Sequence, residues 1–117
     1  MRLKSANINV MVNTCRKAAK ALIRDFGEIE KLQVSLKGPG DFFTAADKRV
    51  EKIIIDELQI ARPSYSILSE ECGEIKKDDS FKWIIDPIDG TSNFLHGLPH
   101  FAISIGLEHK NEIICGI

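Results

Sequence analysis

Apolar residues recur at helical spacing along the first part of the chain. From Ile8 to Phe26 they are three or four positions apart, and basic residues fill positions between them. This period predicts an α-helix with one buried face, and the basic side reads as a solvated face rather than a binding site. Gly27 is expected to end the helix. The predicted buried stripe is Ile8, Val12, Cys15, Ala19, Leu22 and Phe26.

A second helix is predicted from about Thr44 to Arg62, where Pro63 stops it. Thr44 and Asp47 have the spacing of a capping box, with aspartate in place of the usual glutamate. Before this helix, the glycine-rich segment 36–40 predicts a flexible loop. The apolar face of the second helix is expected to comprise Val50, Ile53, Ile54 and Leu58.

The rest of the chain has the pattern of short strands separated by turns. Large and small side chains alternate from Phe101 to Leu107, so the large ones fill one face of a sheet. Residues 75–80 carry mixed charges and predict an exposed connection. The expected strands are 65–69, 83–85, 101–107 and 113–117, with a hairpin turn at 109–112.

Composition narrows the class of protein. The 117 residues allow one domain, and 16 basic against 17 acidic residues give no basic surface that would suggest nucleic acid. The N-terminal residues lack the apolar core of a signal peptide, and no segment is apolar enough for a membrane span, so we expect a cytoplasmic protein. The three cysteines are far apart and read as reduced thiols.

The run 83–85 leads directly into two carboxylates, Asp86 and Asp89, with Pro87 between them. Proline fixes its own φ and lacks an N–H, so a turn is expected that aims both acids at one point. Such a pair suits Mg²⁺, which prefers oxygen ligands. The alternative is an ordinary Asp-Pro turn without chemistry.

Small and hydroxyl residues follow the acids. Gly90, Thr91 and Ser92 stand at the expected start of a short helix, where backbone N–H groups can bind an anion. Acids beside an anion site repel the anion unless a cation lies between them. This arrangement therefore predicts a metal-bridged phosphate.

Other acidic residues and two histidines have competing explanations. Glu70 follows a strand and is a candidate metal ligand, whereas Glu71 and Glu74 read as supporting or surface residues. Asp47 would be favoured in a first helical turn by the helix dipole alone. The spacing of His96 and His100 spans a glycine and a proline, which argues against zinc.

The string from Trp83 to Phe94 closely resembles the metal-binding signature of the inositol monophosphatase family of Mg²⁺-dependent phosphatases. The likeness extends to 69–71 and 44–47, and it covers the first half of a family member. It implies an α+β fold, the layered αβαβα sandwich of the sugar-phosphatase type. Residues 1–117 would be its N-terminal part, namely two helices and the opening antiparallel strands of the first sheet.

The resemblance also implies a set of metal ligands. One Mg²⁺ would be bound by Glu70, Asp86 and the backbone carbonyl of Ile88. A second would lie between Asp86 and Asp89, and an aspartate of the C-terminal half would complete its ligands. We therefore expect little activity from residues 1–117 alone.

The remaining roles concern the substrate and the attacking water. By resemblance, Thr91 and Asp47 activate the water that attacks phosphorus, and the amides of Gly90 and Thr91 hold the phosphate. The substrate is expected to be a small phosphate monoester. The substrate-binding set implied is Glu70, Asp89, Gly90, Thr91 and Ser92.

Three functions follow as expectations. The first is an inositol monophosphatase, with a homodimer as a common assembly among relatives. The second is a related phosphatase acting on histidinol phosphate, fructose bisphosphate or phosphoadenosine phosphate. The third is a non-catalytic remnant or a transcription-associated binding protein. The apolar run 113–117 would leave an uncovered sheet edge, which predicts a larger fold.

Overall fold

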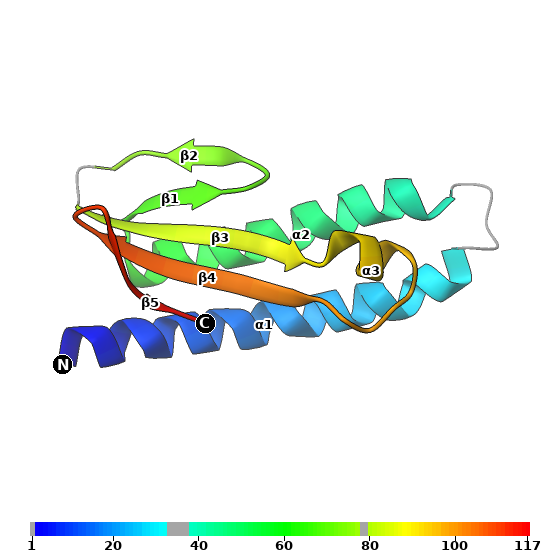
Figure 1. The fold of residues 1–117 in the computed structure, drawn as a ribbon, viewed down its shortest axis with the longest axis horizontal. Coiled ribbons are helices and arrows are strands. Elements are labelled where there is room, and N and C mark those ends of the chain that lie inside the picture. Colours follow the sequence, from blue (N-terminus) through cyan, green and yellow to red (C-terminus); the bar gives the residue numbers. More distant parts are fainter. Residues whose placement is uncertain (1, 33–37, 78–79) are drawn as a thin grey trace.

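Two long helices pack against one face of a five-stranded sheet (Figure 1). The computed structural model describes residues 2–32, 38–77 and 80–117, with side chains for 6–29, 45–77 and 80–117. Helices α1 (Arg2–Leu32) and α2 (Gly38–Ala61) run side by side, and α3 (Thr91–Leu95) follows the central strand. Within these described ranges, no helix is both long and apolar enough to cross a membrane.

The sheet is mixed and has the order β2-β1-β3-β4-β5. β1 and β3 pair in parallel, and every other neighbouring pair is antiparallel. The α+β class is thus confirmed, whereas the expectation of only antiparallel pairing is wrong. The unexpected β2 runs back along β1, so the chain enters β3 in the direction of β1. The strands are β1 (Ser66–Ser69), β2 (Gly73–Ile75), β3 (Phe81–Asp89), β4 (Ala102–His109) and β5 (Glu112–Gly116).

The large side chains of the central strands fill the space between sheet and helices. Trp83, Ile105 and Leu107 are fully buried, which confirms the predicted one-sided alternation in β4. The hairpin between β4 and β5 is also confirmed, with Lys110 and Asn111 at φ 51° and 68°. These left-handed values suit a tight turn between antiparallel strands.

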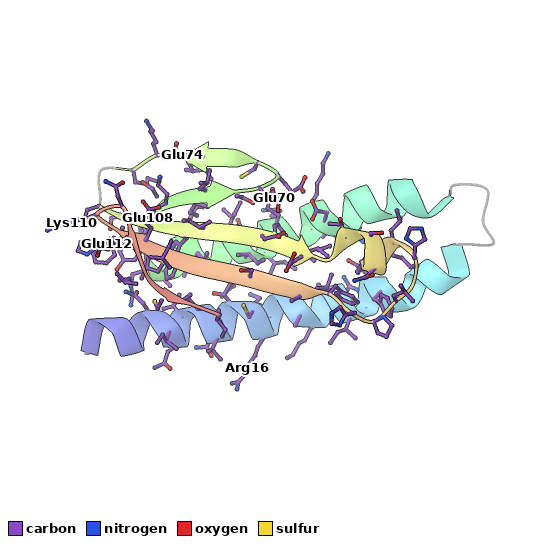
Figure 2. All side chains as sticks on the ribbon, viewed as in Figure 1. Arg16, Glu70, Glu74, Glu108, Lys110 and Glu112 are labelled. Atoms are coloured by element: carbon purple, nitrogen blue, oxygen red, sulfur yellow. The ribbon has the colours of Figure 1, made fainter. Side chains whose placement is uncertain are left out.

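The buried stripe of α1 is rotated relative to the prediction. Ile8 is 37% exposed, whereas its neighbour Asn7 is fully buried. The amide of Asn7 accepts a hydrogen bond from Arg62 at 2.9 Å and donates one to Tyr65 at 3.4 Å. Hydrophobic periodicity counts such polar residues as outward-facing, which explains the error. Arg16, on the basic side of α1, does point away from the sheet (Figure 2).

Both helix boundaries that depended on glycine are wrong. α1 continues through Gly27 to Leu32, because Ile29 beyond the glycine is fully buried and helps to secure the last turns. α2 begins at Gly38, so residues 38–40 are helical, and residues 36–37 lie outside the described part of the chain. Proline is tolerated in a first turn, where its missing N–H breaks no helical hydrogen bond.

The earlier start of α2 changes the interpretation of Asp47. Thr44 lies well inside the helix, so it cannot cap the N-terminus together with Asp47. Asp47 is in the helix interior and is only 5% exposed. The dipole of the first turn therefore no longer accounts for this acid.

Replacing Gly27 with alanine should stabilise the protein. Gly27 is helical, and a Cβ there would meet no other atom within 4 Å. Alanine lowers the entropy cost of ordering the helix, so unfolding in urea should need about 0.5–1 kcal/mol more. Gly27→Ser should give a smaller gain because serine is a weaker helix former. Destabilisation by both variants would contradict a regular helix at this position.

Candidate active site

Parallel pairing of β1 with β3 brings two acids together. Ser69 lies opposite Ile85, and the backbone N–H of Glu70 donates to the carbonyl of Ile85 at 3.2 Å. The residue after each of these is an acid: Glu70 follows Ser69 just beyond β1, and Asp86 follows Ile85 within β3. Glu70 accordingly lies at the end of β1 beside β3 (Figure 2). The side chains of Glu70 and Asp86 are joined by a hydrogen bond.

β3 does not turn at Pro87 as the sequence suggests. The strand continues to Asp89 with an irregular register, because Asp86 faces Ser104 whereas Asp89 faces Ala102. Residues 87–88 thus oppose a single residue of β4, as in a β-bulge, where a proline can be accommodated. In a regular strand, acids three positions apart would point to opposite faces. The bulge removes that constraint.

The surroundings of Asp86 favour its protonated form. Its pKa is raised to about 6, first by burial and then by the charge of Glu70, the hydrogen bond with Glu70 and the charge of Asp89. The backbone N–H of Ile88 donates to the carboxylate and acts in the opposite direction. Like charges close together destabilise ionisation. The Asp86 carboxyl therefore takes up a proton at a higher pH than an ordinary aspartate does.

A second acidic pair lies beside the first. Burial, the charge of Glu71, the charge of Glu51, a hydrogen bond with Glu71 and the charge of Asp86 together raise the pKa of Asp47 to about 7. Glu71, for which a supporting or surface role is expected, acts on Asp47 through its charge and a hydrogen bond. The sequence signal available was its place directly after Glu70. Of these paired acids, Asp47 lies on α2, Glu70 and Glu71 lie in the turn after β1, and Asp86 lies on β3.

α3 is fixed at the end of β3 by a glycine and an aromatic contact. Gly90 has φ 92°, and a Cβ there would come within 2.9 Å of the carbonyl oxygen of His100. Phe94 is fully buried, with its ring centroid 5.8 Å from that of Phe26 and 5.1 Å from that of Phe101. The predicted short helix is confirmed.

Exposed groups stand at the start of α3. Thr91 and Ser92 are both exposed to solvent, and the amide of Asn93 donates to the carbonyl of His100 at 2.8 Å. A pocket of about 240 Å³ opens beside Asp89 and Gly90. The roles of Thr91 with Asp47 in activating water, and of Gly90, Thr91 and Ser92 in binding phosphate, stay predictions.

A larger hollow lies on the sheet face that the helices leave open. It has a volume of about 600 Å³, and both Glu70 and Asp86 line it. Its remaining lining is largely small or apolar. The lining residues are Leu68, Ser69, Glu70, Gly73, Ile84, Ile85, Asp86, Ser104, Gly106 and Ile113.

The acids fit a hard divalent cation in their chemistry. Carboxylate oxygens are its preferred ligands, and a cation would relieve the repulsion that raises the pKa of Asp86. Geometrically, the described residues contain no group of three His, Cys, Asp or Glu side chains arranged around one point. Glu70 and Asp86 are in contact, Asp89 acts on Asp86 through its charge, and Ile88 is 1% exposed. Their roles as metal ligands stay predictions.

The sequence matches the family model described as the inositol monophosphatase family over residues 4–117. It is 57% identical over 112 residues to an inositol-1-monophosphatase of Rhizobium meliloti, covering 95% of this chain and 42% of that protein. It is 40% identical over 111 residues to the Nus factor SuhB of Vibrio cholerae, covering 92% and 42%. The chain thus spans about two fifths of the length of these relatives.

A solved structure has the same fold over most of the chain. The extragenic suppressor protein suhB of Bartonella henselae superposes with a TM-score of 0.82 at 45% identity. The match covers 95% of this chain and 42% of that one. Family and fold therefore agree between the sequence and structure comparisons.

Alanine at Gly90 should destabilise the protein more than alanine at Gly73. Both glycines have positive φ, 92° and 80°, but only the Cβ at Gly90 would clash with backbone. Gly73→Ala should lower the free energy of unfolding by about 1–2 kcal/mol because of the left-handed conformation alone. Gly90→Ala should cost more, as measured by urea denaturation. An equal loss of unfolding free energy in both variants would mean that the backbone at His100 can move away from the added Cβ at little cost.

Stability of the metal-free protein should depend on pH through Asp47. Its pKa rises from 3.8 in the unfolded chain to about 7 in the folded one, so between these values the folded chain binds a proton that the unfolded chain releases. Stability from this group therefore falls as pH rises from about 4 to about 7. Urea denaturation in EDTA across this range should show the decline.

Glu71→Gln should reduce the fall in stability with rising pH, because it removes the charge that contributes most to the raised pKa of Asp47 after burial. Glu74→Gln is the control, since Glu74 forms an ion pair with Lys82 at 3.2 Å. An unchanged pH dependence in Glu71→Gln would contradict the pairing of Asp47 with Glu71.

Proposed function

The chain belongs to the inositol monophosphatase family, and on this premise we propose that the protein hydrolyses phosphate monoesters, with inositol monophosphate as its substrate. The observation that carries the proposal is the contact of Glu70 with Asp86 across parallel strands. Two acids that repel each other at the edge of a hollow are suited to bind a cation and, through it, an anionic ester. The family relatives named inositol-1-monophosphatase support the choice of substrate.

We propose Mg²⁺ as the cation. Glu70, Asp86 and the carbonyl of Ile88 would hold one ion, and Asp86 with Asp89 would take part in holding a second. Bound Mg²⁺ would supply Lewis acidity toward the phosphate ester and toward water. The residues themselves place four oxygen-bearing groups along the bulged end of β3 and the end of β1.

Asp47 and Thr91 would handle the proton of the attacking water. An ionised Asp47 carboxylate can accept a proton through the Thr91 hydroxyl, which leaves water a better nucleophile. Cation binding nearby would favour that ionised form, since neighbouring negative charges contribute to the raised pKa of Asp47. The amides of Gly90 and Thr91, with the Ser92 hydroxyl, would orient the phosphate oxygens.

The proposal also covers the domain, the cellular compartment and the oligomeric assembly of the protein. Residues 1–117 would form the N-terminal part of the phosphatase domain, and a C-terminal part would add an aspartate to the second ion and most contacts to the alcohol. In the described part of the chain, Cys15, Cys72 and Cys115 form no disulfide with one another, which is consistent with a reducing cytoplasm. We propose a homodimer as the assembly.

A second candidate is a non-catalytic binding role. It is favoured by relatives that carry the name Nus factor SuhB at 36–40% identity. Paired acids with raised pKa values are expected of a catalytic site and have no evident use in such a role, so hydrolysis is the leading proposal.

Phosphate release by the complete protein tests the proposal. Inositol monophosphate should be hydrolysed with Mg²⁺ and not in EDTA, and faster than histidinol phosphate, fructose bisphosphate or phosphoadenosine phosphate. Preference for another ester would change the substrate. Absence of turnover by a folded protein that contains Mg²⁺ would favour the binding role.

Asp89→Asn should lower kcat/KM about a hundredfold or more while leaving the melting temperature nearly unchanged. The carboxylate is exposed, so its loss affects the charge at the site more than packing. Glu74→Gln, a change of an acid away from the bulge, should keep full activity. Equal loss of activity and thermal stability in Asp89→Asn would assign Asp89 a structural role.

A further inference from the structure

One buried acid of α2 has no role in the proposed chemistry. Glu51 lies one helical turn after Asp47 on the same face and is 8% exposed. A single carboxylate oxygen, Oε2, accepts two hydrogen bonds. The hydroxyl of Ser69 donates at 2.7 Å, and the backbone N–H of Cys72 donates at 3.1 Å.

These two donors bracket Glu70 and Glu71. Ser69 is the last residue of β1 and is 1% exposed, while Cys72 precedes β2. One oxygen atom on a long helix therefore holds both ends of the turn that carries the two acids. The turn is fixed relative to α2, and so relative to Asp47.

The location of Glu51 is costly on its own. A buried carboxylate is unfavourable unless it is hydrogen-bonded, and the charge of Glu51 contributes to the raised pKa of Asp47 nearby. The two groups that donate hydrogen bonds to it, the Ser69 hydroxyl and the N–H of Cys72, are neutral. A neutral acceptor at this position would reduce the repulsion but would bind the two donors less strongly.

We propose that Glu51 is a positioning residue that holds the turn 69–72 so that Glu70 and Glu71 are in place before a cation binds. The proposal rests on the proposed function. Glu51 acts through the turn and contacts neither substrate nor cation. Residues that orient ligands in this way typically change metal affinity or activity about 10–100-fold when they are replaced.

The test compares Mg²⁺ binding by calorimetry in the complete wild-type protein with Glu51→Gln and Glu51→Ala. Both should raise the Kd for Mg²⁺, Glu51→Ala by about 10–100-fold. The Mg²⁺ concentration for half-maximal phosphate release should rise in parallel, and kcat at saturating Mg²⁺ should be largely retained. Ser69→Ala should have a smaller effect that is not additive with Glu51→Ala, since the two share one hydrogen bond.

Amide hydrogen exchange tests the same positioning role without bound metal and without an activity assay. In EDTA, the Cys72 amide should exchange faster in Glu51→Ala than in wild type, because its acceptor is gone. Asp25→Asn is the matched control. Asp25 is a carboxylate with 3% exposure that pairs with Arg49 at 3.1 Å, so its loss should lower stability without changing Mg²⁺ affinity.

The outcomes separate the two proposals. Wild-type Mg²⁺ affinity in Glu51→Ala, in a protein that remains an active phosphatase, would overturn the positioning role alone. An equal loss of affinity in Asp25→Asn would also overturn it, since general destabilisation would then suffice. If the wild-type protein bound no Mg²⁺, the proposed function and the positioning role would both be overturned.

Discussion

Repulsion between carboxylates at the ends of β1 and β3 is the constraint on which the site depends. Glu70 and Asp86 are neighbours because the two strands are parallel and in a register that puts Ser69 opposite Ile85. Burial and then the charge of Glu70 oppose ionisation of Asp86 and raise its pKa. The fold maintains a local concentration of negative charge that a cation would stabilise.

The framework behind these acids keeps them in place. The buried side chains of Ile67, Trp83 and Ile85 belong to one apolar core with the two long helices. Burial of such side chains contributes about 1.5–3 kcal/mol each, which is enough to offset part of the cost of adjacent charges. The same strands thus supply core on one face and acids at their ends.

Four separate segments contribute to the candidate site, and three of them are shaped or held by different interactions. α2 carries Asp47, hydrogen bonds to Glu51 fix the turn after β1, a bulge shapes the end of β3, and the aromatic contacts of Phe94 hold α3. Membership of the inositol monophosphatase family agrees with this arrangement.

Sequence pattern alone was enough to predict β4 with its one-sided core, the final hairpin and the short α3, and the contiguous motif was enough to predict the family and, through it, the α+β class. These depend on local periodicity and on a contiguous motif, which a sequence displays directly. The folded chain was needed to reveal the parallel β1–β3 pairing, the bulge at Pro87, the pairing of Asp47 with Glu71 and the hydrogen bonds to Glu51. Each joins residues distant in the chain or requires a polar group to be buried, and hydrophobic patterning carries no information about which polar groups find partners.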